Sequence, residues 1–326
     1  MDIQSAMRGA GRRAKRHIRT AIVAATLMGV TGCFPVAQRQ GAVSPRSGDV
    51  GTAAFEEAGP DVARHLTSRY AESFPNCDRN PNAPAFVCSG IMLRGVHAST
   101  AYHAWDVNPT SKKYPGVSFS YLRHDAPLLR LAYGYSAGFI FYPKKYANGN
   151  GLRSVDVLCA FPIDGNTDIR ADKGCGVGDN FQASGPCQAQ GITTAEGWLQ
   201  HFQITAAGVY GHQCAFLVAR GQANSAAIFM QVIAAIGKLN LVEHDKKPDE
   251  LVLDGWAPGN DETLPIEALF YLSTSSSGLA EARSIQEDYK KTASRRVPII
   301  QLTLPATQTD TAKFSYNSGD QAVPGG

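Results

Sequence analysis

The sequence predicts an α+β protein with one disulfide-stapled domain, roughly residues 55–305. Short runs of β-branched and aromatic residues, bounded by Pro, Gly and Asn, recur in the middle and the last third of the chain. Longer stretches with apolar residues at helical spacing stand before, between and after these runs. Six cysteines beyond the N-terminal leader point to disulfides. This combination favours mixed sheets with flanking helices.

The first 33 residues are typical of a lipoprotein signal peptide. Basic residues from Arg8 to Arg19 precede a short apolar run at 20–30, which is too short to cross a bilayer as a mature helix. The run ends in V-T-G-C, so Cys33 is the expected site of a diacylglyceryl group. Phe34 follows in place of the aspartate that retains lipoproteins in the inner membrane. We therefore expect an exported lipoprotein of the outer membrane or cell surface, with the periplasmic side, an ordinary secretory signal or a single anchor helix as alternatives.

The charge balance changes when the leader is removed. The whole chain holds 31 basic and 28 acidic residues, a net charge of +3. The leader holds six of the basic residues and one of the acidic ones, which leaves 25 against 27 and a net charge of −2. The mature chain has no basic stretch with interleaved aromatic residues. The charge therefore argues against nucleic acid as a partner.

The expected elements follow in order after a polar tether at residues 34–54. Apolar residues at helical spacing predict a helix at 55–73. The helix at 194–208 opens with a T-T-A-E capping box, and the helix at 224–239 is apolar around much of its circumference, as a core helix is. The remaining expected elements are strands at 91–96, 116–122, 137–142, 154–161, 250–253, 266–272 and 299–304, a polar loop pinned by cysteines at 164–190, a helix at 278–291 and a frayed C-terminal tail at 306–326.

The six cysteines form an even set in an exported chain, which favours disulfides over a metal site. No C-x-x-C pattern and no paired histidine spacing supports zinc. Spacing alone leaves the connectivity open. The pairs that we expect are Cys77–Cys88, Cys159–Cys214 and Cys175–Cys187. The first and third would close short turn-rich loops, and the second would join V-L-C-A-F to H-Q-C-A-F, two segments that resemble neighbouring strands.

Three polar features at strand positions are candidates for chemistry. Arg94 ends an apolar strand before Gly95, and its planar fork suits a diphosphate. Ser118 and Ser120 alternate on one face of a strand, where two hydroxyls can hold the edge of a sugar. Glu250 begins an apolar strand, where partial desolvation suits a carboxylate that bonds a ribose hydroxyl and stabilises an oxocarbenium charge.

This order of Arg, Ser-x-Ser and Glu resembles the R-S-E pattern of arginine-type ADP-ribosyltransferases and NAD glycohydrolases. The chain is similar to halovibrin-like proteins, exported bacterial proteins of that kind, in the segments G-V-S-F-S-Y-L-R, Y-G-Y-S-A-G-F-I-F-Y-P, D-I-R-A-D-K-G-C-G, Q-G-I-T-T-A and L-P-I-E-A-L-F-Y-L. The resemblance covers roughly residues 77–321. It implies an ADP-ribosyltransferase-like fold and NAD as the substrate, with no resident cofactor.

The resemblance also implies roles for single residues. Arg94 would contact the diphosphate or the phosphate of the nicotinamide ribose. Ser118 would support that ribose and order Glu250, which would bond the 2′-OH and favour the loss of nicotinamide. Ser120 and Tyr121 complete the expected NAD-binding set, although the aromatic residues around Tyr121 either supply a stacking ring or fill the sheet core. The implied activity is NAD hydrolysis, or ADP-ribosyl transfer to a host or envelope protein.

Two departures from the pattern bear on these roles. Transferases that modify arginine carry Glu or Gln two residues before the catalytic glutamate, where this chain has Pro248, so hydrolysis is favoured. The gap from Ser118 to Glu250 is long for the family core, which implies an inserted disulfide loop and helices. The same gap leaves Glu267, at the start of another apolar strand, as a rival carboxylate.

Other interpretations stay open at the level of sequence. Arg94 can serve the structure by pairing with Asp78, Asp106 or a backbone carbonyl. The protein can be a non-catalytic surface lipoprotein that binds a host or envelope partner, or a glycoside hydrolase with Glu250 and Glu267 as its carboxylate pair. The chain has no P-loop, G-x-G-x-x-G or H-E-x-x-H motif, which argues against Walker, Rossmann and zinc-protease chemistry.

One local motif, D-G-N-T-D at residues 164–168, resembles a calcium loop because oxygen-bearing side chains stand at every second position. Ile169 stands where calcium loops have glycine, and Cys175 where they have glutamate. We therefore expect a polar loop without a metal, with calcium as the lesser alternative.

Overall fold

A computed structural model of the chain describes residues 53–72, 89–98, 103–106, 116–141, 146–148, 151–153, 156–166, 169–176, 184–206, 213–218, 224–239, 248–254, 266–293 and 296–322. This part of the chain is α+β, as predicted, with one nine-stranded mixed sheet, four helices and two disulfides. The leader and the tether up to residue 52 lie outside the described residues, as do Cys33 and the expected pair Cys77–Cys88. None of the described helices is long and apolar enough to span a bilayer.

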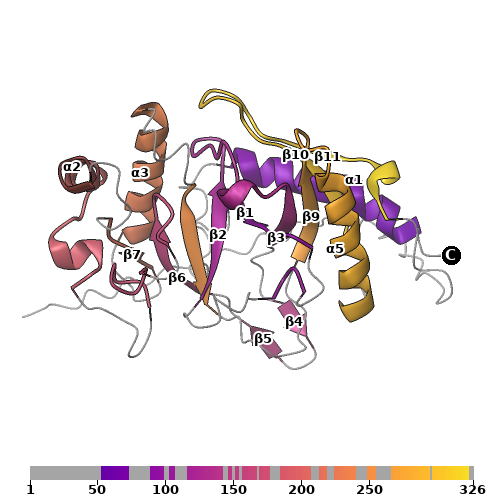
Figure 1. Cartoon of the computed structure of the whole chain (residues 1–326), viewed down its shortest axis with the longest axis horizontal. Coiled ribbons are helices and arrows are strands. Elements are labelled where there is room, and N and C mark those ends of the chain that lie inside the picture. Colours follow the sequence, from indigo (N-terminus) through magenta and orange to yellow (C-terminus); the bar gives the residue numbers. More distant parts are fainter. Residues whose placement is uncertain are drawn as a thin grey trace, which may run out of the picture. The chain divides into compact units, whose positions relative to one another are not determined.

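The sheet has the strand order β11-β10-β9-β3-β1-β2-β8-β6-β7 (Figure 1). Strands β9 and β10 are parallel, and the other neighbours in the sheet are antiparallel. Its strands are β1 (Ile91–Gly95), β2 (Val117–Leu122), β3 (Ala137–Phe141), β6 (Asp156–Phe161), β7 (Phe216–Leu217), β8 (Glu250–Asp254), β9 (Ile266–Leu272), β10 (Ile299–Thr303) and β11 (Lys313–Tyr316). Strand β3 is buried along its whole length, as expected where both faces of a sheet are covered. A separate two-stranded ladder pairs β4 (Tyr146–Asn148) with β5 (Gly151–Arg153).

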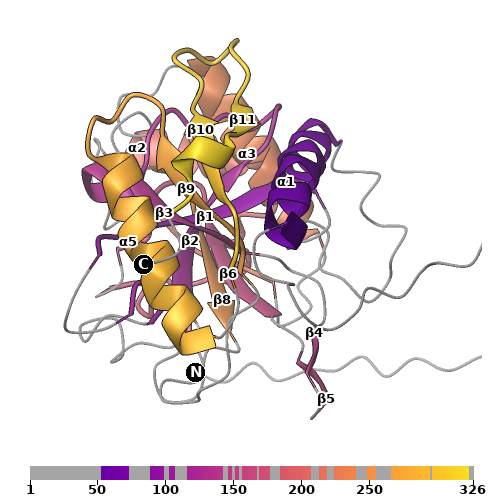
Figure 2. The same cartoon turned by 90° about the vertical axis from the view of Figure 1, so that its right-hand side faces the viewer.

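Helices cover both faces of the sheet. The four helices are α1 (Ala53–Ala71), α2 (Ala195–Ala206), α3 (Ser225–Leu239) and α5 (Gly278–Ala293). Helix α1 packs its apolar stripe, including Leu66, against Ile91 and Leu93 of β1. Helices α2, α3 and α5 pack against the opposite face, which carries Phe119 and Phe139. Figure 2 shows α1 and α5 on opposite sides of the strands.

The predicted elements agree closely with this structure. Each of the eleven expected strands and helices has a counterpart of the same type with ends within two residues of the expected ones. The expected C-terminal tail is a correction, because residues 313–316 form the edge strand β11, which pairs with β10 and buries Phe314. The described part of the domain therefore extends to Ala322 and does not end near residue 305.

Strand β2 joins two halves of the sheet. Residues 120–122 pair with β1, and residues 117–119 pair with β8. The ladder between β1 and β2 ends at the pair Leu93–Ser120. Beyond that point the carbonyl of Ser118 accepts a hydrogen bond from the Arg94 side chain in place of a strand amide. The end of this ladder brings Arg94 to β2.

The disulfides differ from the expected ones. The structure joins Cys159 to Cys175 and Cys187 to Cys214, with Cα–Cα distances of 5.8 and 4.9 Å. The expected bonds Cys159–Cys214 and Cys175–Cys187 are therefore wrong. The two cysteine-bearing segments do lie on neighbouring strands, because β6 pairs with β7. Their register sets Cys159 opposite Leu217, so that Cys214 lies beyond the ladder and bonds elsewhere.

Candidate functional site

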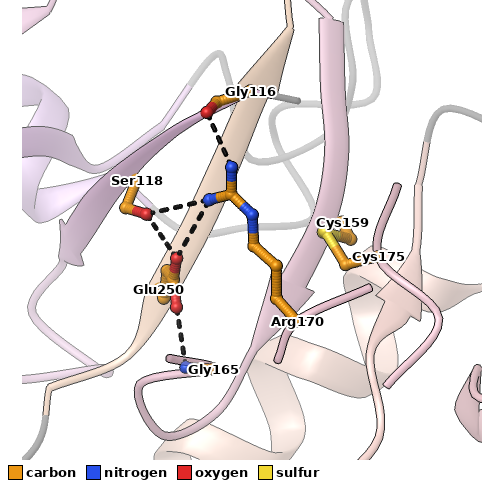
Figure 3. The surroundings of a disulfide bond; sticks show 7 residues. All are labelled: Gly116, Ser118, Cys159, Gly165, Arg170, Cys175 and Glu250. Carbon is orange, nitrogen blue, oxygen red and sulfur yellow. Dashed lines mark hydrogen bonds and ion pairs between the residues drawn. A yellow bond between two sulfur atoms is a disulfide. The ribbon is translucent and has the colours of Figure 1, made fainter. Parts of the chain in front are cut away.

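The candidate site is built around Glu250, the first residue of β8 (Figure 3). Only 4% of Glu250 is exposed, so its carboxylate needs partners inside the protein. Ser118 Oγ donates a hydrogen bond to Oε1, and the backbone N–H of Gly165 donates to Oε2 over 2.6 Å. The register of β2 and β8 pairs Ser118 with Val252, which makes Ser118 and Glu250 diagonal neighbours on one face of the sheet.

Arg170 completes the polar cluster from a loop outside the sheet. Arg170 is 1% exposed, and its guanidinium points at the start of β2 and toward Glu250 on the neighbouring β8 (Figure 3). Nη1 donates to Ser118 Oγ over 3.2 Å and lies 3.7 Å from Glu250 Oε1, while Nη2 donates to the carbonyl of Gly116 over 2.8 Å. A buried guanidinium is tolerated when hydrogen bonds and an anion surround it, and both conditions hold at this position.

The loop that carries Arg170 is held at several points. The disulfide Cys159–Cys175 ties its far end to β6. Lys173 is buried, and its Nζ donates to the carbonyl of Gly165 over 2.5 Å. Gly165 itself lies against the Phe161 ring, and a side chain there would come within 2.6 Å of it. The glycine is therefore required for the backbone N–H to reach Glu250.

Two aspartates beside Glu250 have perturbed acidities. Burial, together with the nearby charge of Glu250, raises the pKa of Asp164 to about 6. Burial also raises the pKa of Asp249 to about 8, against the hydrogen bond that its Oδ1 accepts from the Tyr121 N–H over 2.7 Å. The cluster thus holds three carboxyl groups, two of which keep a proton more strongly than an exposed aspartate does. Such perturbed acids are more frequent at functional sites than elsewhere.

Arg94 reaches this group from the other face of the sheet. The register sets Arg94 opposite Phe139, so its side chain starts on the face that carries Met92 and Phe139. Ser118 and Glu250 start on the opposite face. Arg94 Nη1 donates to the backbone carbonyl of Ser118 over 2.9 Å. Consecutive hydrogen bonds therefore link Arg94, Ser118 and Glu250, but the three side chains do not share one face, and Arg94 makes the backbone-carbonyl contact that was one of its structural alternatives.

The two other expected NAD-binding residues are also separated by the sheet. Ser120 is half-buried and shares the face of Ser118 by alternation. Tyr121 is completely buried on the opposite face, where its hydroxyl donates to the carbonyl of Ser89 over 3.0 Å. Burial raises the pKa of Tyr121 to about 12. This placement agrees with a core role for Tyr121, since its ring has no exposed face to stack on a ligand.

Glu267, the rival carboxylate, lies in a different cluster. It is 8% exposed on β9, and His65 Nδ1 lies 2.5 Å from its Oε1, with Arg69 Nη1 3.6 Å from Oε2. Strands β3, β1 and β2 separate β9 from β8, and four strand spacings place the two glutamates about 19 Å apart. Glycosidase carboxylates stand about 5–9.5 Å apart. The pairing of Glu250 with Glu267 in a glycoside hydrolase is therefore wrong.

The calcium alternative finds no support among the described residues. Asp164 Oδ1 accepts a hydrogen bond from the backbone N–H of Asn166 over 2.9 Å, and its carboxyl hydrogen-bonds Glu250. Thr167 and Asp168 lie outside the described residues. Within the described ranges, no three His, Cys, Asp or Glu side chains come together as metal ligands.

Sequence reasoning missed Arg170, Asp164 and Asp249 as parts of the cluster. Arg170 stands in D-I-R-A-D-K-G-C, a segment noted for its resemblance but without a role for its arginine. The only local signal was a pair of cations just before Cys175, which becomes informative once the disulfide to Cys159 is known. Burial of the two aspartates depends on packing that no local pattern indicates.

The arrangement can hold one oriented carboxylate beside a serine, two neighbouring acids and a buried arginine. These groups can bind a hydroxyl, stabilise a developing positive charge and retain or release a proton near neutral pH. No protein-family model matches this chain, and no curated protein or solved structure matches it either.

Proposed function

We propose that the protein cleaves NAD, as a hydrolase that releases nicotinamide and ADP-ribose, with ADP-ribosyl transfer to a host or envelope protein as a variant. The observation that supports this most is the hydrogen bond from Ser118 to Glu250 across β2 and β8. Arg94 binds the carbonyl of the same serine. The R-S-E resemblance and an ADP-ribosyltransferase-like fold both imply a carboxylate oriented by a serine in this way.

In the proposed reaction Glu250 supplies the negative charge. The bond between the anomeric carbon and the nicotinamide nitrogen breaks, and both electrons leave with nicotinamide. Positive charge then spreads over the anomeric carbon and the ring oxygen, where a carboxylate in a dry site stabilises it. The ribose 2′-OH donates to a second acceptor site of Oε2, beside the Gly165 N–H, while Ser118 keeps Oε1. Water adds to the anomeric carbon and loses a proton, which gives ADP-ribose.

The resemblance implies that Arg94 binds the diphosphate of NAD, but its side chain starts on the face of the sheet opposite Glu250. We therefore assign no NAD contact to Arg94. Its role is to fix the backbone of Ser118 through the hydrogen bond to the Ser118 carbonyl. Ser120, next along the same face, is the candidate for a ribose hydroxyl.

We also propose that the protein acts outside the cytoplasm, anchored by a lipid on Cys33 at the outer membrane or cell surface. Two disulfides close segments of the domain, and such bonds persist in oxidising compartments. The composition of the leader supports export.

The test is nicotinamide release from NAD by a lipid-free form of the protein that begins after Cys33, residues 34–326. We expect wild-type protein to release nicotinamide and S118A to be about 10- to 100-fold slower, because Glu250 loses its orienting hydroxyl. The matched control is S136A, since Ser136 Oγ donates to Glu281 over 3.2 Å in another serine–glutamate pair of the same domain. S136A should match wild type. Absence of release by wild-type protein, or equal rates for S118A and wild type, contradicts the proposal.

A second candidate is a non-catalytic surface lipoprotein that binds a host or envelope partner. The observation that favours it is the burial of Glu250, whose two oxygens already accept hydrogen bonds from Ser118 and Gly165. In that case the cluster only joins β2, β8 and the loop. This candidate predicts neither NAD cleavage nor NAD binding by calorimetry.

A further inference from the structure

We propose that Arg170 is the positioning residue for Glu250: it holds the carboxylate in register with Ser118 and so prepares it for the substrate. This inference rests on the proposed function. The guanidinium bridges the start of β2 to Glu250 on β8, through Ser118 Oγ at 3.2 Å, the carbonyl of Gly116 at 2.8 Å and Glu250 Oε1 at 3.7 Å. It belongs to neither strand, so it fixes the two relative to each other.

The hydrogen-bond directions explain how Arg170 orients the pair. A serine hydroxyl has one hydrogen to donate and two acceptor positions. Because Arg170 Nη1 donates to Ser118 Oγ, that oxygen is an acceptor toward the loop. Its single hydrogen is then directed at Glu250 Oε1. Without Arg170, the hydroxyl could rotate and donate elsewhere, and Oε1 would lose its fixed donor.

The local charges give the arginine a second effect. Three carboxyl groups meet in the cluster, from Glu250, Asp164 and Asp249, and they face the cations of Arg170 and Lys173. Lys173 acts on Asp164 and donates to the carbonyl of Gly165, whereas Arg170 is the cation at Glu250. Removal of Arg170 therefore leaves acids that repel one another and that retain protons to higher pH.

The experiment compares R170Q and R170K with R123Q in the mature protein. Arg123 is a buried arginine paired with Asp125 in the turn that follows β2, which makes R123Q the control for loss of a buried guanidinium. We expect R170Q to lower kcat for NAD about 100-fold with KM changed less than about threefold. The acid limb of its kcat profile should move to higher pH. R170K, which keeps the charge, should recover part of kcat, and R123Q should keep both kcat and the pH profile.

A readout without substrate separates this inference from the proposed function. The Gly165 amide donates to Glu250 Oε2, so its NMR shift and its hydrogen-exchange protection report the position of the carboxylate. R170Q should weaken the protection of this amide, and R123Q should not. If wild-type protein does not cleave NAD while this difference holds, the proposed function fails and the positioning by Arg170 stands.

Three results would overturn the inference. The first is that R170Q folds and keeps both the wild-type kcat and the wild-type pH profile. The second is R170Q with a higher kcat, which would make Arg170 a cover over Glu250. The third is a Gly165 amide with unchanged protection in R170Q.

Discussion

Glu250 and Glu267 are two buried glutamates of one sheet that have opposite kinds of partner. Glu250 is the first residue of β8 and Glu267 the second of β9, and the two are 4% and 8% exposed. Glu250 is held by a strand hydroxyl, a backbone amide and an arginine from a disulfide-closed loop. Glu267 is held by His65 and Arg69, two side chains of helix α1, and 41% of the His65 side chain is exposed.

The difference shows which carboxylate is held more rigidly, and the proposed function uses that one. Backbone and short side-chain donors cannot follow a moving carboxylate, so Glu250 sits in a fixed polar frame. On the Glu267 side Arg69 is buried as well, and only His65 is open to solvent, which screens its interaction with Glu267. The same local sequence setting therefore produces a rigid site at one strand and an ordinary helix-to-sheet ion pair at the other.

The largest expected effect on stability comes from removing the arginine that contacts each glutamate, Arg170 at Glu250 or Arg69 at Glu267. R170M leaves Glu250 buried without its cation and should destabilise the protein by about 3–5 kcal/mol. The matched variant R69M should cost about 1–2 kcal/mol, because His65 still contacts Glu267. Urea unfolding at neutral pH measures both values. Equal losses in the two variants would remove the contrast between the clusters.

An effect of similar size comes from the protonated acid that only the Glu250 cluster contains. Burial raises the pKa of Asp249 to about 8, well above the ordinary aspartate value of 3.8. The folded state therefore binds a proton that the unfolded state releases, and stability falls as pH rises from about 4 to about 8. In D249N the amide oxygen still accepts from the Tyr121 N–H, so this loss of stability, worth about 5 kcal/mol at pH 8, should disappear.

The measurement for D249N is the free energy of unfolding across this pH range, with E267Q as the control from the other cluster. E267Q should retain the decline that wild-type protein shows. A decline in D249N as steep as in wild type would mean that Asp249 does not hold a proton in the folded state.

The smallest effect is expected at the exposed edge of the Glu267 cluster. H65Q should change stability by less than about 1 kcal/mol, because a half-exposed partner is screened by solvent. The same variant should leave NAD cleavage unchanged. Thermal unfolding at low and at high salt checks this, and a loss above about 3 kcal/mol would make the two clusters alike.

Much of the fold could be predicted because its elements carry clear periodic patterns. The segment at 266–272 is an uninterrupted apolar run around one glutamate, and the structure has β9 at those residues. The short strands β4, β5 and β11 were missed because three or four residues do not display a period. Because β11 was missed, the edge strand of the sheet was predicted to be part of a frayed tail.

The candidate site could be predicted only where its residues lie on strands. The alternation of Ser118 and Ser120 indicated a polar face, and Glu250 is indeed the diagonal neighbour of Ser118. Arg170 could not be predicted, since its position depends on a disulfide whose partner the spacing of cysteines does not specify. We did not predict that Arg94 lies on the face of the sheet opposite Ser118. Alternation within β1 does not reveal the register between β1 and β2.

The most direct measurement is the rate of nicotinamide release from NAD by wild-type protein, E250Q and E267Q. Both substitutions remove one buried carboxylate from the same sheet, so losses from misfolding should be comparable and can be checked by unfolding. The account predicts that E250Q lowers kcat about 1000-fold or more and that E267Q stays within about threefold of wild type. An E250Q protein that cleaves NAD at the wild-type rate, or an E267Q protein that alone loses activity, would contradict it.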